Sequence, residues 1–315
     1  MAADVKFDLA HKRVWVAGHR GMVGSTLCRR LEAEKCEILT VGRETLDLTR
    51  QADVEAWMTA NAPDAVFMAA AEVGGILAND SYPAEFIYSN LVIQNNIIDT
   101  ARTCGVKKLM FLGSSCIYPK FAAQPMAEEA LLTGELEPTN QWYAIAKIAG
   151  IRMCQAYRRQ YGCDFISAMP TNLYGPGDNF ELQNSHVAPA LMVKAHQAKM
   201  AGEAKMEVWG SGTVKREFLH VDDLADGVVH LMKVYSDDSH VNIGTGEDVT
   251  IRELAELICR VVGYDGELAF DATKPEGAPR KLLDVSKLKG LGWQAKTSLA
   301  DGMADAYAWY LANVA

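Results

Sequence analysis

The alternation of short apolar segments with longer helical ones most constrains the fold of this chain. Residues 13–18, 37–41 and 65–70 are short β-rich runs, and residues 22–35 and 53–61 between them have helical periodicity. The alternation continues with a helix at 84–104, a strand at 108–115, a helix at 141–161 and a strand at 164–170. Strands joined in this way lie parallel, with helices on both faces. The sequence therefore predicts an α/β fold built on a Rossmann-type doubly wound parallel sheet.

The character of the chain changes at about residue 171. The segment 171–186 is rich in Gly, Asn and Pro, which is typical of loops. Beyond it, residues 207–212 and 241–244 are expected to be strands, and Thr250 is expected to open a helix. We therefore expect a second, smaller C-terminal α/β unit.

Composition excludes several classes of function. The 315 residues carry a net charge of −9 with a pI near 5.3, so neither nucleic acid nor an anionic membrane surface is an expected partner. No run approaches the roughly 18 apolar residues of a membrane span, and residues 1–13 lack the apolar core of a secretion signal. The seven cysteines are scattered without a CxxC pair, which favours reduced thiols in a cytoplasmic protein over disulfides or a metal site.

A glycine-rich loop connects the first expected strand to the first expected helix. Its residues are Gly18, His19, Arg20, Gly21, Met22, Val23 and Gly24, a GxxGxxG run. Backbone N–H groups at the start of a helix lack intrahelical partners and carry the positive end of the dipole, so they bind phosphate well. Glycines also let the chain approach the phosphate closely. The loop therefore predicts a dinucleotide site.

Charged residues near this loop bear on which nicotinamide dinucleotide binds. Arg43 follows the second expected strand and Arg20 lies in the loop, and two guanidinium groups suit the 2′-phosphate of NADP(H). Glu44 lies where an acidic residue would bind the ribose hydroxyl of NAD. We predict NADP(H), and Glu44 leaves NAD as the alternative.

A Tyr–Lys pair lies on the helix expected at 141–161. Tyr143 and Lys147 are four residues apart, so they share one helix face. A cation beside the phenol is expected to lower the tyrosine pKa and make it an acid/base for a carbonyl–alcohol pair. Ser114 follows the fourth expected strand, at the sheet edge where ligands gather. A glycine loop, a strand-end serine and YxxxK in this order are typical of short-chain dehydrogenases.

Longer motifs resemble one family within that group. They are GHRGMVGS, GSSCIYP, EPTNQWYAIAKIAGI, PTNLYGP, NSHV, VWGSGT, REFLHVDD and RKLLDV. These motifs resemble the GDP-L-fucose synthase family of extended short-chain dehydrogenases. The resemblance implies NADPH-dependent 3,5-epimerisation and 4-keto reduction of GDP-4-keto-6-deoxy-D-mannose to GDP-L-fucose by a homodimer. It also implies a Rossmann domain at 1–172 and a mainly substrate-binding domain at 173–315, with about 213–247 returning to the first domain.

The resemblance implies roles for individual residues. The implied catalytic residues are Ser114, Cys116, Tyr143, Lys147 and His186. The implied cofactor contacts are the glycine loop, Arg43, Asp47, Leu48, Leu112, Gly113, Ser114, Ser115, Tyr143, Lys147, Pro170, Thr171, Asn172, Leu173 and His186. The implied GDP-sugar contacts are Asn172, Lys194, Trp209, Arg216, Glu276 and Lys281.

Epimerisation beside a ketone needs a base on one face of the sugar ring and an acid on the other. Cys116 is the expected base, with its thiol pKa lowered by nearby cations. His186 is the expected acid, because imidazole titrates near neutrality. Ser114 and Tyr143 would donate to the C4 oxygen in both reactions, so one oxygen site could serve both.

The expected substrate contacts include two departures from the family pattern. Arg216 and Lys281 suit a diphosphate, and Trp209 offers a stacking face. Glu276 stands where the family usually has Asp, which moves a carboxylate by one methylene. Glu72 stands where the family usually has Lys, a change of little consequence if the position is on the surface.

Two rival functions share part of this pattern. A nucleotide-sugar 4-epimerase or dehydratase would have the glycine loop and YxxxK but would show no net reduction. A non-catalytic NADP-binding sensor or scaffold would be expected to lack Ser114, Tyr143 or Lys147, and all three are present.

Overall fold

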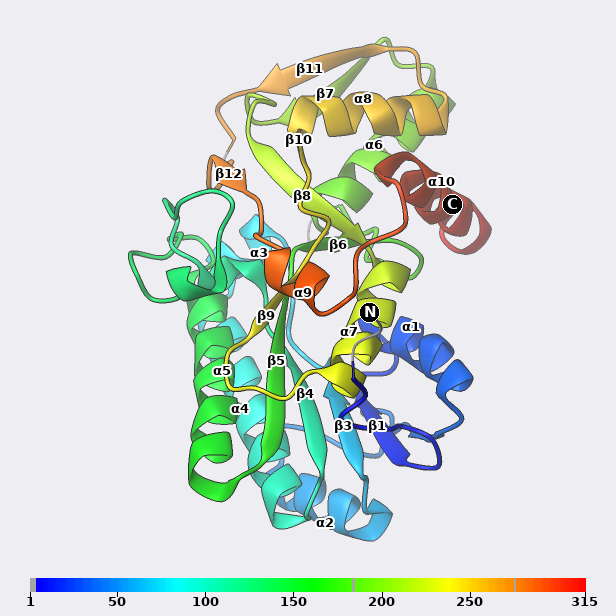
Figure 1. Ribbon diagram of the computed structural model, residues 1–315. Helices are drawn as coiled ribbons and strands as arrows, with labels where there is room; N and C mark the ends of the chain where they lie inside the picture. Colours follow the sequence, from blue (N-terminus) through cyan, green and yellow to red (C-terminus); the bar gives the residue numbers. More distant parts are fainter. Residues whose placement is uncertain (1–3, 183–184, 275) are drawn as a thin grey trace.

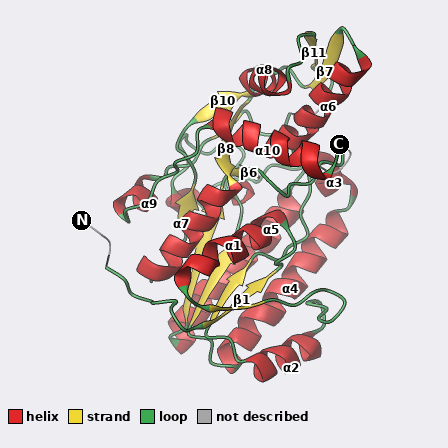
Figure 2. Ribbon diagram, turned by 90° about the vertical axis from the view of Figure 1, so that its right-hand side faces the viewer, coloured by secondary structure: helices red, strands yellow, loops and turns green. Residues whose placement is uncertain are grey.

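The computed structural model describes residues 4–182, 185–274 and 276–315. A lower unit built on a parallel sheet lies beneath a smaller unit that contains the C-terminus (Figure 1). Figure 2 shows helices on both faces of the sheet. The predicted α/β class is confirmed. Within the described ranges, no helix combines the length and the apolar character needed to cross a membrane.

The main sheet is parallel and, within the described residues, has the order β2-β1-β3-β4-β5-β9. The strands are β1 Arg13–Ala17, β2 Glu37–Leu39, β3 Ala65–Met68, β4 Lys108–Leu112, β5 Asp164–Pro170 and β9 Val241–Ile243. Since β2 lies on one side of β1 and the later strands lie on the other, the strand order reverses beside β1. Parallel sheets bind ligands at such a switch point, outside the carboxyl ends of the strands.

Two groups of helices cover the sheet. One face is covered by α2 Gln51–Asn61, α4 Pro83–Thr103 and α5 Gln141–Tyr161, and a short α3 Ile76–Ser81 precedes α4. The other face is covered by α1 Met22–Leu31 and α7 Val221–Val234, with α9 Ser286–Gly290 at its edge. Figure 1 shows α4 and α5 on one side of the sheet and α1 and α7 on the other.

Successive residues of β1 enter different cores. Trp15 packs with Ile97 of α4 in one core, and Val16 packs with Leu27 and Leu224 in the other. All are fully buried, and burial of a large aliphatic side chain contributes about 1.5–3 kcal/mol. Because both faces are covered, the strands are apolar throughout, which is the pattern that made them visible in the sequence.

The smaller unit is built around β8 Lys215–His220. This strand pairs with β6 Asn172–Tyr174, β10 Asp248–Thr250 and β12 Arg280–Lys281, and β7 Lys205–Trp209 pairs with β11 Glu267–Asp271. The helices α6 Val187–Ala201, α8 Ile251–Val262 and α10 Leu299–Asn313 enclose the third core. Thr250 caps α8 through a capping box with Glu253, so the predicted helix start is confirmed.

The chain passes between the two units more than once. It leaves β8 into α7, which packs against α1, and then adds β9 to the edge of the main sheet. It returns to the smaller unit at β10. This path brings β8 and β12 next to the carboxyl ends of the main strands. The domain boundaries drawn from the sequence stay a prediction.

Candidate active site

The loop after β1 depends on glycine at two positions. Gly18 has a φ of +86°, and a Cβ there would lie 2.7 Å from the backbone nitrogen of Ala70. A Cβ on Gly24 would lie 2.1 Å from the Gly18 carbonyl oxygen. Gly21 is the N-cap of α1, and no side chain caps this helix. The first-turn N–H groups are therefore left for a phosphate rather than for a capping side chain.

Arg20 and Glu44 form an ion pair beside this loop. Arg20 Nη1 donates to Glu44 Oε2 at 2.8 Å, and a second bond makes the pair bidentate. Both side chains are exposed. Glu44, the acidic residue that would bind the ribose hydroxyl of NAD, is therefore already paired with the guanidinium group of Arg20. Arg43 is exposed on the same segment.

The segment that follows is fixed by local hydrogen bonds. Asp47 Oδ1 accepts from the Thr49 N–H at 2.9 Å and from its hydroxyl at 2.7 Å. These bonds, with help from Arg43 and Arg50, hold the pKa of Asp47 below its usual value. The Leu48 carbonyl oxygen accepts from Asn96 of α4 at 2.9 Å. The predicted cofactor residues at 43–48 thus lie on an ordered edge next to β2.

The end of β4 carries the predicted serine and cysteine. Ser114 is the N-cap of a 3₁₀ turn at Ser115–Ile117, and its Oγ accepts from the Cys116 N–H at 3.5 Å. Cys116 is buried, with an exposed fraction of 7%. A Cβ on Gly113 would lie 2.2 Å from Met169 Sδ, so this position is closely packed. Leu112 and Ser115 are also buried.

Tyr143 and Lys147 lie on the face of α5 that is turned toward β4. Lys147 Nζ donates to the Leu112 carbonyl oxygen at 2.9 Å and lies 5.6 Å from the centroid of the Tyr143 ring. A Cβ on Gly150 would lie 2.3 Å from the Phe111 ring, so glycine lets α5 approach the strand closely. Phe86 of α4 packs edge-on against Tyr143.

Burial, not charge, dominates the protonation of this pair. Burial raises the pKa of Tyr143, and Cys116 adds to the rise. Burial lowers the pKa of Lys147 to about 8. The expectation that Lys147 lowers the Tyr143 pKa is therefore wrong, because the amine is bound to a backbone carbonyl and both groups are desolvated. The neutral phenol is the form that can donate a proton.

The expected lowering of the Cys116 pKa is wrong for the same reason. Burial raises the thiol pKa, while Lys281, Ser114 and Lys147 oppose the rise. Partial desolvation by neighbouring groups lowers the pKa of His186 and the charge of Lys281 adds to this, although the side chain keeps an exposed surface. His186 is the N-cap of α6, and its side chain is solvent-accessible and does not cap the helix.

Lys281 connects the two predicted epimerase residues. Its charge acts on both Cys116 and His186, and burial lowers its own pKa. Cys116 lies just after β4, and that the thiol, the imidazole and the amine share one site stays a prediction.

The corner between β5 and β6 carries the predicted contacts Pro170 to Leu173. Pro170 ends β5, and the Thr171 N–H donates to the Ile243 carbonyl oxygen at 3.0 Å. Thr171 Oγ1 and Asn172 Nδ2 donate to the main-chain oxygen of Glu217 at 3.2 and 2.8 Å. Leu173 packs against the core beneath α7. Glu217 belongs to the REFLHVDD motif but was not singled out in the sequence, because a lone acidic residue in a strand indicates no particular role.

Trp209 lies between two lysines at the far end of the smaller unit. Lys194 Nζ is 5.1 Å and Lys274 Nζ is 5.4 Å from its ring. The Trp209 side chain is 45% exposed, and its Nε1 donates to Glu207 at 2.8 Å. An exposed indole flanked by cations suits a purine ring with an attached diphosphate. Lys274 is a candidate contact that the sequence did not indicate.

Arg216 and Lys281 lie side by side on paired strands. Lys281 of β12 is in register with Arg216 of β8. Arg216 donates to the Lys215 carbonyl oxygen at 2.8 Å and to that of Glu276 at 2.7 Å, and burial lowers its pKa to about 10. The expected Glu276 carboxylate contact to the sugar gains no support, because that carboxylate binds the N–H and hydroxyl of Ser211.

The Glu72 departure lies on the surface. Its side chain is exposed, whereas its backbone N–H and carbonyl oxygen both bond to the Asn90 side chain at 3.1 and 3.0 Å. The change of side chain therefore leaves the local structure intact.

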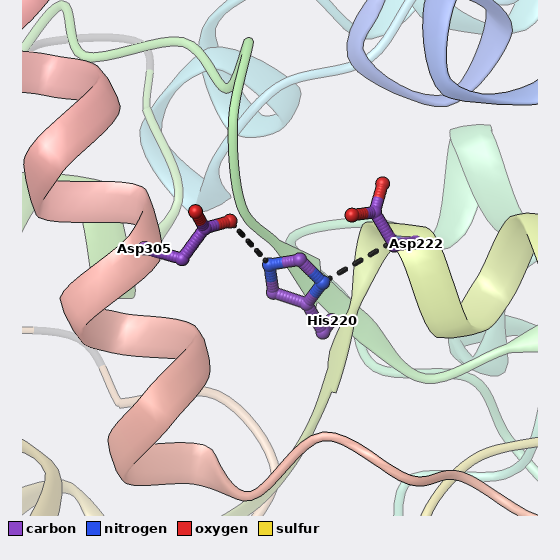
Figure 3. A group of neighbouring side chains, drawn as sticks. All are labelled: His220, Asp222 and Asp305. Carbon is purple, nitrogen blue, oxygen red and sulfur yellow. Dashed lines mark hydrogen bonds and ion pairs between the residues drawn. The ribbon is translucent and has the colours of Figure 1, made fainter. Parts of the chain in front are cut away.

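A second group of polar side chains lies at the junction of β8 and α7 (Figure 3). His220, Asp222 and Asp305 each bring one possible ligand atom within 4.8 Å of the others. His220 Nδ1 accepts from the Asp222 N–H at 3.3 Å, so Nε2 carries the ring proton and faces Asp305 at 3.2 Å. The Asp222 carboxylate pairs with Arg29. Since a protonated nitrogen cannot ligate a metal, the group fits a helix cap with ion pairs.

The fold and the Tyr–Lys–Ser arrangement define a dinucleotide-binding oxidoreductase or epimerase of the short-chain dehydrogenase type. Residues 14–244 match the NAD dependent epimerase/dehydratase family. The chain is 58% identical over 304 residues to GDP-L-fucose synthase of Sinorhizobium fredii, covering 96% of this chain and 97% of the relative. It is 60% identical over 303 residues to GDP-L-fucose synthase 1 of Arabidopsis thaliana, covering 96% and 94%.

A solved structure shares the whole architecture. It is a GDP-L-fucose synthetase from Naegleria fowleri bound to NADP, with a TM-score of 0.91 and 26% identity over 99% of this chain and 98% of that one. The chain therefore belongs to the NAD dependent epimerase/dehydratase family and, within it, to the GDP-L-fucose synthase family.

Proposed function

We propose that this protein converts GDP-4-keto-6-deoxy-D-mannose to GDP-L-fucose by 3,5-epimerisation and NADPH-dependent 4-keto reduction. The observation that carries the proposal is the shared site at the end of β4. Ser114, Tyr143 and Lys147 adjoin it, and Lys281 acts on both Cys116 and His186. The names of the similar proteins support the same reaction.

The residues present fit NADP(H). The uncapped, glycine-lined start of α1 suits the pyrophosphate, and Arg20 and Arg43 suit a 2′-phosphate. Residues 112–115, the corner at 170–173 and Lys147 are the proposed contacts to the nicotinamide ribose end. When bound, NADPH supplies the hydride that reduces C4.

Tyr143 is the proton donor in the reduction. Its raised pKa keeps the phenol protonated at neutral pH, so it can give the proton to the C4 oxygen. Ser114 donates a second hydrogen bond to this oxygen, which stabilises the charge that develops there. Lys147, held by the Leu112 carbonyl oxygen, binds the cofactor ribose next to Tyr143.

Cys116 and His186 exchange protons with the carbons beside the ketone. Cys116 removes a proton from one face, and Lys281 and Lys147 partly offset the burial that disfavours its thiolate. His186 returns a proton on the other face. The Ser114 and Tyr143 donors hold the enolate oxygen that forms between the two steps.

The nucleotide is bound by the smaller unit. Trp209 and Lys194 suit the guanine end, whereas Arg216, Lys281 and Asn172 suit the diphosphate and sugar. The Glu276 carboxylate is bound by Ser211, so the proposed contact of Glu276 to the sugar is made by the loop that carries it.

The quaternary state and compartment are part of the same proposal. Tyr88 on α4 and Trp142 and Ile145 on α5 are exposed large apolar side chains on helices that pack together, which supports a homodimer of this chain through these helices. Free thiols at all seven cysteines support a reducing, cytoplasmic setting.

Incubation with GDP-4-keto-6-deoxy-D-mannose and NADPH in deuterated water tests the proposal. We expect NADPH oxidation, a GDP-L-fucose product and deuterium at C3 and C5. Cys116→Ser should slow deuterium incorporation at least about 100-fold while NADPH binding is retained, since a positioned acid or base contributes about 10²–10⁴. A product without net reduction would instead assign a 4-epimerase, and cofactor binding without turnover would favour a sensor.

A further inference from the structure

Glu217 is a buried acidic residue that the proposed mechanism does not use. It lies within β8, next to Arg216, and its exposed fraction is 0%. A carboxylate in such a place is tolerated when hydrogen bonds satisfy its oxygens. Its partners therefore show which parts of the molecule it holds.

The side chain holds two segments that meet beside β8. Oε2 accepts from the Leu283 N–H at 2.9 Å, two residues after Lys281. Oε1 accepts from the Gly246 N–H at 2.8 Å and from the Thr245 hydroxyl at 3.4 Å, both in the loop after β9. Burial raises the pKa of Glu217, and these donors oppose the rise. Bonds from backbone N–H groups to a carboxylate are stronger than neutral ones.

The main chain of the same residue holds a different part of the site. Its carbonyl oxygen accepts from Thr171 Oγ1 and Asn172 Nδ2, at the proposed cofactor corner. A side-chain substitution would leave this carbonyl in place. The Thr171 hydroxyl also acts on the carboxylate, but the carbonyl oxygen and its bond from Asn172 remain after a side-chain substitution, so the two roles of Glu217 can be separated by experiment.

The segment that carries Lys281 is anchored on its amino-terminal side by an ion pair between Arg280 and Asp248 and by a bond from the Lys215 N–H to the Pro279 carbonyl oxygen at 3.0 Å. β12 is two residues long, with Arg280 opposite Lys215 and Lys281 opposite Arg216. Next to it, the Leu282 N–H donates to Gln124 Oε1 at 2.9 Å, and the Leu282 carbonyl oxygen accepts from Met126. On the carboxyl-terminal side of Lys281, the Glu217–Leu283 bond is the charge-assisted anchor.

We propose that Glu217 is a positioning residue whose carboxylate fixes the β12 segment, so that the Lys281 amine lies beside Cys116 and His186 and meets the diphosphate of the substrate. This inference rests on the proposed function in so far as Lys281 binds GDP. It adds a requirement: substrate affinity depends on a carboxylate that does not touch substrate.

Glu217→Gln is the first test, with GDP and NADPH as separate probes in calorimetric titrations. The amide presents a donor to the Gly246 or the Leu283 N–H, so one anchor is lost. We expect the Kd for GDP to rise about tenfold, the typical effect of losing a charge-assisted hydrogen bond. The Kd for NADPH should change less than about twofold, because the Glu217 main-chain carbonyl is retained.

Asp223→Asn is the matched control. Asp223 is buried, and its Oδ2 accepts from the backbone N–H groups of Lys296 and Thr297 at 2.9 and 2.7 Å, away from β12. This variant removes a carboxylate of the same kind and should leave the Kd for GDP unchanged. Glu217→Asp, which keeps the charge, should restore part of the GDP affinity.

A double-mutant cycle with Lys281→Ala tests the route of the effect. If Glu217 acts through Lys281, Glu217→Gln should change the Kd for GDP less than about twofold once Lys281 is absent. Additive effects, an unchanged Kd for GDP, or equal losses for GDP and NADPH would each overturn the proposal. Failure of both Glu217 variants to fold would also overturn it, since the carboxylate would then serve the fold itself.

Binding is measured without turnover, so the two proposals fail separately. A wild-type protein that binds GDP as expected but does not reduce the keto-sugar would contradict the proposed function alone. A protein that turns over the keto-sugar but shows no selective effect of Glu217→Gln on GDP would contradict the positioning role alone.

Discussion

Single side chains in the proposed site are governed by burial. Tyr143, Lys147, Cys116 and His186 all have pKa values displaced toward their neutral forms. Neutral groups are less costly to desolvate, so the Cys116 thiolate that acts as the base depends on neighbouring cations. Lys281 is the neighbour that favours the Cys116 thiolate most strongly.

Tyr143→Phe separates the two proposed reactions. Without the phenol oxygen, reduction should fall by about 10²–10⁴, the usual contribution of a positioned acid. Some deuterium exchange into the keto-sugar should remain, because Cys116, His186 and the Ser114 donor to the enolate oxygen are retained. Stopped-flow NADPH oxidation and mass spectrometry of the sugar measure the two rates. Wild-type reduction by this variant would remove Tyr143 from the mechanism.

Arg43→Ala tests the choice of cofactor. Loss of a guanidinium contact to the 2′-phosphate should weaken NADPH binding about tenfold or more and leave NADH binding nearly unchanged. Glu55→Ala, an exposed change on α2, is a suitable control. Fluorescence titration with both cofactors gives the ratio, and an unaltered NADPH preference would exclude Arg43 from the phosphate site.

At the scale of elements, the segment between β6 and α6 contains Asp178, an aspartate with a buried carboxyl oxygen. Asp178 Oδ2 is buried and has no hydrogen-bond partner among the residues that the structure describes, while Oδ1 accepts from the Asn179 N–H at 2.7 Å. It faces a space lined by Tyr174, Phe180, Pro189, Met192 and Met303, among other residues. Burial raises its pKa to about 7. The same segment leads to His186.

Asp178 should therefore make stability depend on pH. The pKa of Asp178 is about 3.9 in the unfolded chain and is raised to about 7 in the folded one. Its favourable contribution to the free energy of unfolding is therefore complete below pH 4 and is lost as pH rises through about 7. Asp178→Asn should be more stable than wild type at pH 8 by on the order of 2 kcal/mol, and the gain should vanish near pH 4. Urea unfolding at both pH values measures this. A gain that is equal at the two pH values would contradict the titration of Asp178.

At the scale of the whole molecule, the proposed assembly is open to a direct test. Tyr88 on α4 is 66% exposed, and Met200 on α6 is 73% exposed but lies on the smaller unit. Tyr88→Glu should convert a dimer of 34.4 kDa chains to monomers at micromolar concentration, because a desolvated, unpaired charge weakens an interface by several kcal/mol. Met200→Glu should remain dimeric. Sedimentation velocity distinguishes the two, and a monomeric wild type would refute the interface.

The sequence by itself determined the layered fold and predicted the cofactor end of the site. Strands buried on both faces are apolar along their length, and the glycine loop and YxxxK pair are local patterns, so α5 Gln141–Tyr161 and β5 Asp164–Pro170 were predicted at their observed bounds. Strands β6, β10 and β12 have two or three residues, too few for a periodicity to show.

The tertiary structure alone decided the surroundings of the proposed site residues. Local spacing predicted that Lys147 would act on Tyr143, but the Leu112 carbonyl oxygen, on another element, binds the amine. Charge and burial depend on groups far apart in sequence. The charge of Lys281 acts on Cys116, and Glu217 accepts hydrogen bonds from both Asn172 and Leu283. Desolvation and long-range hydrogen bonds exist only once the chain is folded, which is why no pattern of neighbours along the sequence could supply them.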